Sequence, residues 1–222
     1  MKKKLLKTMA VGAAISLVMQ SMVFADYDET KAVSYAKENY NNTKSGEYYY
    51  YSGKNCTNFV SQCIYAGGIR GLENTYLIDS IAASIYDTIT DDDTTYRYWY
   101  MKKQKKLGKT YYVTTPNWIR VEEFRRYHHL HKGNLITYTT IDEYGNWNAE
   151  KVDVLLQSLE VGDIVQVGDE HSVIISSVGS NQNQYDVLYT AQSNNYVDRQ
   201  MYNLIEFAKK KNCEKIYVMK FK

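Results

Sequence analysis

The stretch DIVQVGDEHSVIISSV, residues 163–178, decides the fold, because it holds two runs of apolar and β-branched residues joined by a Gly-Asp-Glu turn. Runs of this kind between turn residues predict β-strands. Similar runs at 185–191 and 216–221 extend the pattern toward the C-terminus. Helical patterns come first in the chain, so the sequence predicts an α+β fold in which N-terminal helices pack on a central antiparallel sheet.

The spacing of apolar residues outside these runs predicts helices. Asp28 is a candidate N-cap for the first helix, and the Gly67-Gly68 pair ends the second. The expected helices cover residues 29–40, 56–66, 77–89, 116–127, 149–159 and 201–210, and a further strand is expected at 135–140. No clear period is present at 99–116, and no linker divides the chain, so we expect one domain.

The first 25 residues have the parts of an export signal. Four lysines precede an apolar run from Met9 to Val18, and small residues follow at Val23-Phe24-Ala25. The run is short for a membrane span, so an uncleaved anchor is the less favoured alternative. We therefore expect a signal peptide at 1–25 and a single domain at 26–222. The product would be secreted or cell-wall associated, without stable insertion in the membrane after cleavage.

Composition and charge narrow the function classes. The chain has 44% apolar and 23% charged residues and a mean hydropathy of −0.51, which is typical of a globular protein. Residues 1–25 carry four of the 27 basic side chains and none of the 25 acidic ones, which leaves a formal net charge of −2. This balance gives no electrostatic support for nucleic-acid binding.

Cys56, Cys63 and Cys213 are the cysteines of a chain that we expect to be exported, and an odd number cannot all pair internally. In a helix, Cys56 and Cys63 would lie about 10 Å apart along the axis, beyond disulfide reach. Cys56 falls where a loop becomes a helix, and the positive end of the helix dipole favours a thiolate there. The sequence therefore predicts Cys56 as a nucleophile and Cys63 as a packing residue.

A nucleophilic thiolate needs a base, and the chain has four histidines. His128, His129 and His131 lie at a charged helix end, whereas His171 opens a predicted strand just after a turn. A histidine at the rim of a sheet can face a helix start, so His171 is the expected partner of Cys56. A solvated rim histidine without a role is the alternative.

Strand register suggests a third member of the site. If Val178 pairs with Tyr185, His171 stands directly opposite Gln192 on the same face of the sheet. The Gln192 amide would then accept the imidazole N–H and orient the ring. A slip of two residues would put Asn194 there instead, so Asn194 is the alternative.

Several blocks of this sequence resemble the putative amidase domain family of Gram-positive bacteria, which is related to the CHAP and NlpC groups. The resemblance covers about residues 28–205 and rests on CTNFVSQ at 56–62 with AGG at 66–68, KAVSYA at 31–36, Trp118, GDIVQ at 162–166 and HSVI at 171–174. It implies a papain-like cysteine hydrolase fold and cleavage of amide bonds, with cell-wall peptidoglycan as the usual substrate. It also implies Cys56 as nucleophile and His171 as base.

Two positions depart from the family pattern. An acidic residue is common just before the cysteine of the family, where this chain has Asn55. A histidine followed by threonine is usual near the position of Gln192-Ser193. The second departure weakens the assignment of Gln192 as the orienting residue, although an amide can still orient His171.

Residues around the expected nucleophile are the candidates for substrate contact. A run of tyrosines ends just before it, and flat amphipathic rings suit sugars and peptides. The expected substrate-binding residues are Tyr50, Tyr51, Asn55, Thr57 and Asn58, the last two near solvent. The rival functions are a secreted cysteine protease acting on proteins and a catalytically silent binding protein on the same fold.

No cofactor is expected, because a Cys–His mechanism needs none, and the chain has no glycine motif for nucleotide binding. No metal is expected either, since helix spacing brings only two of the three clustered histidines together. The strip of lysines at 102, 103, 105, 106 and 109 is most often a soluble face. Its alternative role is approach to an anionic wall polymer or membrane surface.

Overall fold

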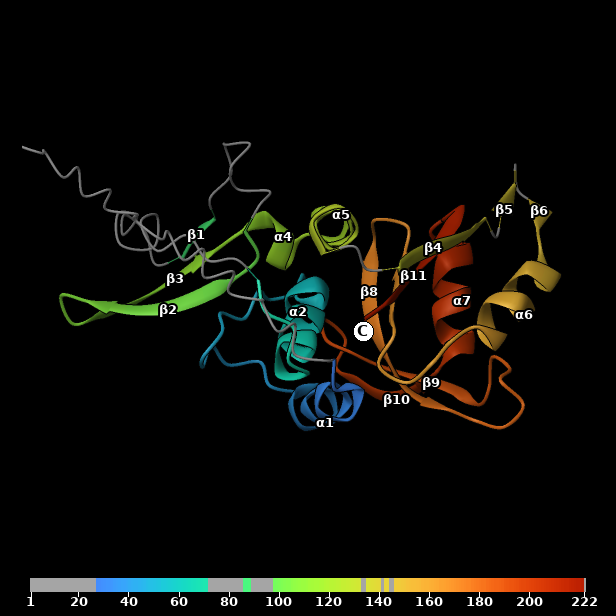
Figure 1. Cartoon of the computed structure of the whole chain (residues 1–222), viewed down its shortest axis with the longest axis horizontal. Coiled ribbons are helices and arrows are strands. Elements are labelled where there is room, and N and C mark those ends of the chain that lie inside the picture. The colour runs from blue at the N-terminus through green and yellow to red at the C-terminus, as the bar shows by residue number, and fades with distance from the viewer. Residues whose placement is uncertain are drawn as a thin grey trace, which may run out of the picture.

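A computed structural model describes residues 27–71, 86–88, 98–132, 135–140, 142–143 and 146–221 (Figure 1). The helices are α1 (Glu29–Asn39), α2 (Cys56–Ala66), α4 (Pro116–Ile119), α5 (Val121–Lys132), α6 (Ala149–Gln157) and α7 (Met201–Lys210). The strands are β1 (Tyr86–Thr88), β2 (Met101–Lys106), β3 (Lys109–Thr114), β4 (Leu135–Thr140), β5 (Asp142–Glu143), β6 (Asn146–Trp147), β7 (Ile164–Val167), β8 (His171–Val178), β9 (Val187–Ala191), β10 (Tyr196–Gln200) and β11 (Lys215–Lys220). The expected signal peptide lies outside the described residues.

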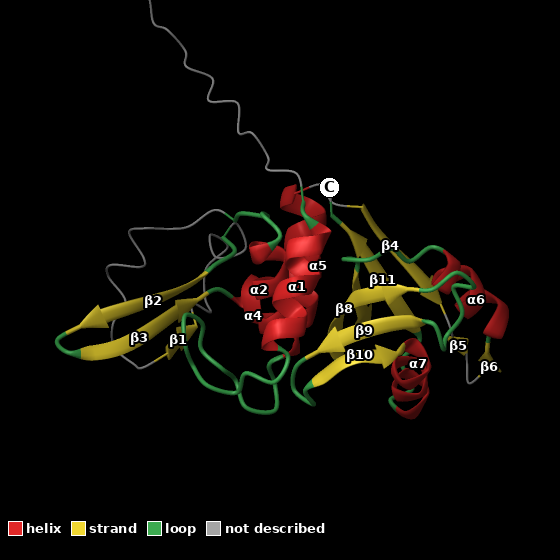
Figure 2. Ribbon diagram, turned by 90° about the horizontal axis from the view of Figure 1, so that it is seen from below, coloured by secondary structure: helices red, strands yellow, loops and turns green. Residues whose placement is uncertain are grey.

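A six-stranded sheet forms the centre of the fold, with the strand order β10-β9-β8-β7-β11-β4. Every neighbouring pair in it is antiparallel. Helices α1 and α2 lie on one side of the sheet, and α6 and α7 lie on the other (Figures 1 and 2). The predicted α+β class, with N-terminal helices on an antiparallel sheet, is confirmed at this level.

Both faces of the sheet are covered by helices, which explains why its strands are apolar along most of their length. Ile164 and Ile174 pack in the core that α1, α2 and α5 share. Val165 and Val173, one residue along each strand, pack in the core that contains α6 and α7. Because side chains alternate across a strand, residue parity decides which core each side chain enters.

The sequence signals at the ends of α1 and α2 act as expected. The Asp28 side chain accepts a hydrogen bond from Lys31 N at 2.9 Å, which caps α1. Gly67 ends α2, and its N–H bonds back to Cys63 O. None of the helices in the described ranges combines the length and the hydropathy that crossing a membrane would need.

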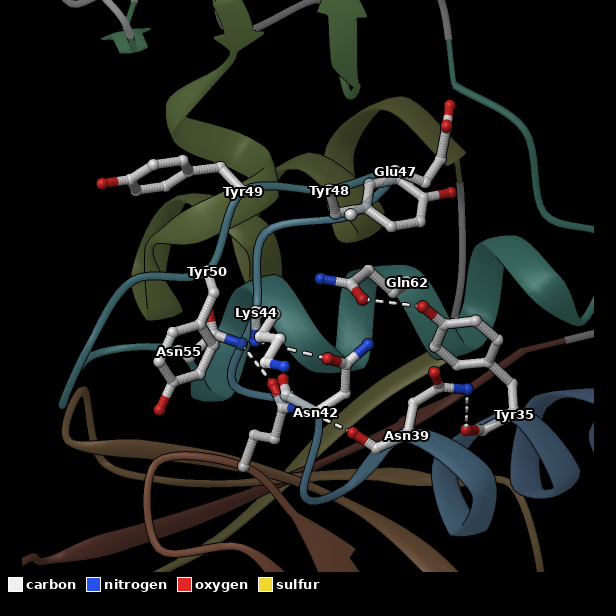
Figure 3. Close-up of a pocket in the computed structure, with 12 residues that line it drawn as sticks. Tyr35, Asn39, Asn42, Lys44, Glu47, Tyr48, Tyr49, Tyr50, Asn55 and Gln62 are labelled. Carbon is white, nitrogen blue, oxygen red and sulfur yellow. Dashed lines mark hydrogen bonds between the residues drawn. The ribbon is translucent and has the colours of Figure 1, made fainter. Parts of the chain in front are cut away.

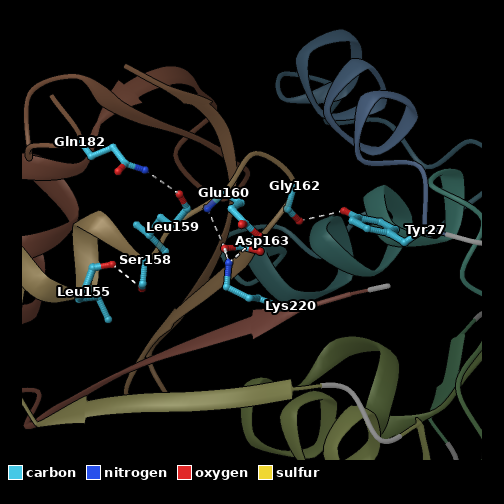
Figure 4. A network of polar contacts seen from close by, with 9 residues as sticks. All are labelled: Tyr27, Leu155, Ser158, Leu159, Glu160, Gly162, Asp163, Gln182 and Lys220. Carbon is cyan, nitrogen blue, oxygen red and sulfur yellow. Dashed lines mark hydrogen bonds and ion pairs between the residues drawn. The ribbon is translucent and has the colours of Figure 1, made fainter. Parts of the chain in front are cut away.

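A polar network fixes the loop that leads into β7 (Figure 4). The Asp163 carboxylate accepts hydrogen bonds from Glu160 N at 2.9 Å and from Lys220 Nζ at 3.0 Å. Tyr27 OH donates to Gly162 O at 2.9 Å. Gly162 has φ +89°, and a Cβ atom there would lie 2.5 Å from the Glu29 Cβ, so only glycine fits. The network holds the start of β7 against the N-terminus of α1.

Three expectations about the middle of the chain are wrong or incomplete. Residues 86–88, expected to be helical, form β1, which pairs in parallel with β3; the rest of the expected helix at 77–89 lies outside the described residues. The stretch without clear period forms the antiparallel hairpin β2–β3. The helix expected at 116–127 is divided by Arg120, which has extended backbone angles (φ −109°, ψ 141°), into α4 and α5.

Candidate active site

Cys56 is the first residue of α2, and its side chain is half-buried. Cys63, two turns along the same helix, is fully buried, and burial raises its pKa well above the ordinary value. Cys63 is therefore an inert packing thiol, as the sequence predicts. All three cysteines are free thiols, and Cys56 is the most accessible of them.

The first turn of α2 begins without a side-chain cap. The N-cap residue Asn55 instead uses its side-chain oxygen to accept hydrogen bonds from Tyr51 N at 3.0 Å and Asn58 Nδ2 at 2.8 Å. The backbone N–H groups at the start of a helix have no partner within the helix. Beside Cys56 they form a ready site for the oxygen of a tetrahedral intermediate.

The turn between β9 and β10 clamps the residue before the thiol. Asn55 N donates to Ser193 Oγ at 2.9 Å, and Asn55 Nδ2 donates to the side-chain oxygen of Gln192. Gln192 Nε2 in turn donates to the backbone oxygens of Asn39, at 2.6 Å, and Asn42, at 3.1 Å. Because every one of these groups is uncharged, the clamp holds the start of α2 in a way that does not depend on pH.

A second set of polar contacts joins α2 to β8. Thr57 Oγ1 lies 3.2 Å from Ser172 Oγ, which accepts a hydrogen bond from Gln166 Nε2 at 3.0 Å. Gln166 Oε1 accepts from Arg125 of α5 at 3.0 Å, and the same guanidinium reaches Asp169 Oδ1 at 2.7 Å. Helix α2 and the turn before β8 are thus fixed to each other through side chains.

His171 is the first residue of β8, as predicted, but its ring does not face α2. Its neighbour Ser172 points to Thr57, and alternation along the strand turns His171 to the opposite face. There its ring packs on Phe207 of α7 with centroids 5.7 Å apart. Burial lowers the pKa of His171 to about 4, so the ring is neutral at neutral pH. Among the described contacts, none joins this ring to Cys56.

The predicted register between β8 and β9 is wrong. Val178 pairs with Val187, and after a bulge Ile174 pairs with Thr190. Gln192 therefore lies on the α2 face of the sheet, where it binds Asn55, and it does not face His171. Val178 pairs two residues further along the chain than predicted, and the bulge between Ile175 and Ser177 then shifts the register back by one residue.

Three other expected site residues, Asn194, Thr57 and Asn58, do not lie where the sequence predicts. Asn194 is an exposed turn residue, and no contact of its side chain to His171 is present in the described part of the chain. Thr57 and Asn58, expected near solvent, are fully buried. Asn58 Nδ2 donates to Tyr49 O, and its Oδ1 accepts from Trp118 Nε1 at 2.8 Å. Thr57 and Asn58 therefore support the site from inside and are not placed to contact a substrate.

A polar cavity of about 410 Å³ opens beside the start of α2 (Figure 3). Its lining consists mainly of tyrosines and amides: Tyr35, Tyr48, Tyr49, Tyr50, Asn39, Asn42, Asn55, Gln62 and Gln192, with Lys44, Gly46 and Glu47. Burial raises the pKa of Tyr48 to about 12, so its phenol is neutral at ordinary pH. Tyr50 and Asn55 line this cavity, Tyr51 lies outside its lining, and substrate contact by these residues stays a prediction.

Potential metal ligands are not gathered anywhere in the described ranges. His128 is buried among aromatic rings, with centroids 4.5 Å from Phe124 and 5.0 Å from both Trp99 and Phe221. Within the described residues no three His, Cys, Asp or Glu side chains lie close enough together to hold a metal ion. His128 is a core residue of α5, whereas the adjacent His129 is exposed.

Comparison with protein families shows to which family the chain belongs. The family model described as "Putative amidase domain" matches residues 26–219. The chain belongs to this family. The description is that of a hydrolase that acts on amide bonds, and the match spans both the helix of Cys56 and the strand of His171. Comparison with curated proteins and with solved structures gives no match.

Three residues that the sequence did not single out as site residues shape the site of this amidase-family chain. Ser193 receives the N–H of Asn55, Ser172 contacts Thr57, and Arg125 ties α5 to the turn before β8. Ser193 follows Gln192 in a turn, where a serine hydroxyl often binds backbone N–H groups, so a turn-based search could have found it. Arg125 gave no signal, because its partners are more than 40 residues away in the chain.

Proposed function

We propose that this protein is a cysteine hydrolase of papain-like arrangement that cleaves amide bonds, with Cys56 as the nucleophile. Membership of the amidase family supports the reaction class. The observation that carries the proposal is the position of Cys56, a half-buried thiol at the uncapped start of α2 beside a polar cavity. A helix start favours both a thiolate and the oxyanion that its attack creates.

In the proposed reaction, the thiolate of Cys56 attacks the amide carbonyl carbon and forms a tetrahedral oxyanion. The N–H groups of the first turn of α2 bind this oxygen. The C–N bond then breaks, a protonated base gives its proton to the departing amine, and a thioester to Cys56 is left. The neutral base next removes a proton from water, and the hydroxide attacks the thioester to release the acid and the Cys56 thiolate, which leaves the base protonated again.

His171 is the proposed base, and this assignment requires a conformational step. Ser172, the next residue of β8, contacts Thr57, so the backbone of His171 lies close to the start of α2. The ring would have to leave Phe207 and turn past the end of the strand to reach Cys56. Burial lowers the pKa of His171 to about 4, so the ring is neutral while it lies on Phe207. When it turns toward Cys56, it can therefore accept a proton.

The proposed substrate is a peptide or amide bond of cell-wall peptidoglycan. Two features support a neutral, polar peptide or sugar ligand. The cavity beside α2 is lined by tyrosines and amides, and only Lys44 and Glu47 carry charge there. An export signal at 1–25 would deliver the enzyme to this substrate. Cleavage by such a mechanism uses no cofactor or metal.

Digestion of purified peptidoglycan tests the proposal. We expect mass analysis to find new amine and carboxyl ends in the released muropeptides, and Cys56→Ser to release none. Cys213→Ser is the matched control, because it removes another thiol in the same chain, and it should retain activity. If the protein cleaves casein and not peptidoglycan, it is a protease that acts on proteins. If it cleaves neither substrate, the proposed hydrolase activity is refuted.

A second candidate is a binding protein on this fold without catalytic activity. The orientation of His171 favours it, because the ring packs on Phe207 and leaves Cys56 without an imidazole partner among the described residues. Iodoacetamide separates the two functions. An enzyme predicts preferential alkylation of Cys56 near neutral pH, lost in His171→Ala. A binding protein predicts slow alkylation of Cys56 that His171→Ala does not change.

A further inference from the structure

The β2–β3 hairpin projects away from the body of the molecule (Figures 1 and 2). Its strands pair in continuous register from Met101 with Thr114 to Lys106 with Lys109. Burial of the side chains decreases from the base of the hairpin to its end. Tyr112 and Val113 near the base are buried, and residues 105–109 at the end are all exposed. We call residues 105–109 the hairpin tip.

Leu107 lies at the outermost part of the tip and combines an exposed apolar side chain with a left-handed backbone. Its side chain is 94% exposed, and its backbone is left-handed with φ +52°. Gly108 follows with φ +76°, so two successive residues are left-handed, as in the tightest hairpin turns. Asn, Asp or Gly is favoured at such a position, and a branched apolar side chain is strained there. Folding and solubility would both favour another residue, so leucine at this position points to a contact outside the chain.

Lysines surround Leu107 on both faces of the hairpin. Lys106 and Lys109 form the last cross-strand pair, and Lys105 belongs to the opposite face together with Lys103. All four are exposed, and residues 101–114 contain no acidic residue. Like charges directly opposite each other destabilise a strand pair, so the arrangement of Lys106 and Lys109 also lacks a folding explanation.

We propose that the hairpin tip docks on an anionic phospholipid surface, with Leu107 inserted among the acyl chains and the lysines on the headgroups. Charge complementarity selects an anionic partner, and lysines near such a surface each strengthen binding. The apolar tip selects a lipid surface over a soluble polyanion, because a polymer of phosphates offers no apolar layer for the leucine. The docking surface is independent of the proposed hydrolase.

Tryptophan fluorescence can report whether the tip itself enters a bilayer. The full chain carrying Leu107→Trp is mixed with vesicles of phosphatidylcholine and phosphatidylglycerol that contain brominated acyl chains. We expect strong quenching of the new tryptophan. Leu130→Trp is the matched control, since Leu130 is 64% exposed on α5, and it should show no added quenching. Because residues 1–25 are present in both variants, attachment through them affects both alike, and equal quenching or none would overturn the proposal.

Charge variants test the lysines. In the Leu107→Trp chain, replacing Lys105, Lys106 and Lys109 together by Gln should reduce the quenching of the introduced tryptophan and weaken vesicle binding by at least about tenfold. The matched control replaces Lys209, Lys210 and Lys211, at the end of α7, by Gln in the same Leu107→Trp chain. It removes the same charge elsewhere and should leave the quenching unchanged. If both triple variants lost the same amount of quenching and vesicle binding, net charge alone would explain the effect, and a specific site at the tip would be refuted.

Leu107→Asn separates docking from stability. Asparagine suits the left-handed backbone better than leucine, so the variant should unfold at the same or a higher urea concentration. It should nevertheless bind the anionic vesicles several-fold more weakly, because the inserted apolar side chain is lost. Unchanged vesicle binding by Leu107→Asn would overturn the lipid assignment. Binding of the tip to a soluble polyphosphate, without binding to vesicles, would also overturn it.

Discussion

The imidazole ring of His171 lies against the phenyl ring of Phe207, with centroids 5.7 Å apart and planes inclined by 56°. Burial lowers the pKa of His171 to about 4, and Phe207 is one of the side chains that cover the ring. Phe207→Ala should admit water to the ring, so we expect the pKa to rise toward the ordinary value of about 6.5. An NMR titration of the imidazole protons measures this pKa. Phe207→Leu, which keeps an apolar cover, should leave it low; an unchanged pKa in Phe207→Ala would contradict the role given to Phe207.

The same substitution tests the conformational step proposed for catalysis. If the ring must leave Phe207 to serve Cys56, Phe207→Ala weakens the closed state and raises the population of the open one. We expect kcat for amide cleavage to rise about twofold or more, with KM unchanged because Phe207 lies on the face of the sheet away from the cavity. A fall in kcat with an unaltered circular dichroism spectrum would argue against His171 as the mobile base.

The lowered pKa of His171 predicts sensitivity to acid. The pKa in the folded state is about 4 and the unfolded value is about 6.5, so the unfolded chain binds more protons between these values. Stability is therefore complete above pH 6.5 and is lost as the pH falls toward 4. At about pH 4.5 the loss should be about 2.5 kcal/mol. His171→Phe should show a smaller loss, measured as urea unfolding near pH 7 and pH 4.5; identical losses would assign the effect to other groups.

Much of the fold could be predicted because helices cover both faces of its central sheet. The apolar runs became β7, β8, β9 and β11, and the amphipathic pattern of 201–210 became α7 with the same bounds. The hairpin β2–β3 and strand β10 could not be recognised in the same way. Both carry mainly polar side chains, since much of each is exposed, and the alternation that marks a strand needs one buried face.

The site was harder to predict than the fold, because its geometry depends on strand parity. The sequence indicated that Cys56 begins a helix and that His171 begins a strand, and both positions hold. Which face His171 takes depends on a register that a slip of one residue reverses. The long hairpin loop and the bulge between Ile175 and Ser177 set that register, and neither has a clear pattern in the sequence. The sequence therefore identifies the candidate groups but not the direction in which their side chains point.

The cavity beside α2 predicts a binding effect for Tyr50. Its side chain lines the cavity, while its backbone N–H is held by Ser45 Oγ at 3.0 Å. Tyr50→Ala removes the ring and keeps the backbone contact, so we expect KM for a peptidoglycan fragment to rise about threefold to tenfold, with kcat nearly unchanged. Tyr138→Ala, an exposed tyrosine of β4 outside the cavity lining, is the matched control. Equal KM values for the two variants would exclude the cavity as the substrate site.

The clamp on Asn55 predicts that Gln192 acts by holding Cys56 in position and not by orienting His171. Gln192 is 3% exposed, and its amide partners are Asn55, Asn39 and Asn42. Gln192→Leu would leave these groups buried without partners, which should cost about 2–4 kcal/mol of stability in urea unfolding. The start of α2 would loosen, so kcat should fall at least about tenfold.

Alkylation of Cys56, mapped by mass spectrometry, distinguishes the two roles of Gln192. Loosening of the clamp leaves the thiol accessible, so the rate of alkylation in Gln192→Leu should stay the same or increase while kcat falls. An orienting residue of a Cys–His pair would behave differently, because its loss would lower the thiolate fraction and slow alkylation together with catalysis. Gln192→His keeps a donor and an acceptor, so it should recover part of the lost stability. A parallel fall of alkylation and kcat in Gln192→Leu would return Gln192 to the role that the sequence first suggested for it.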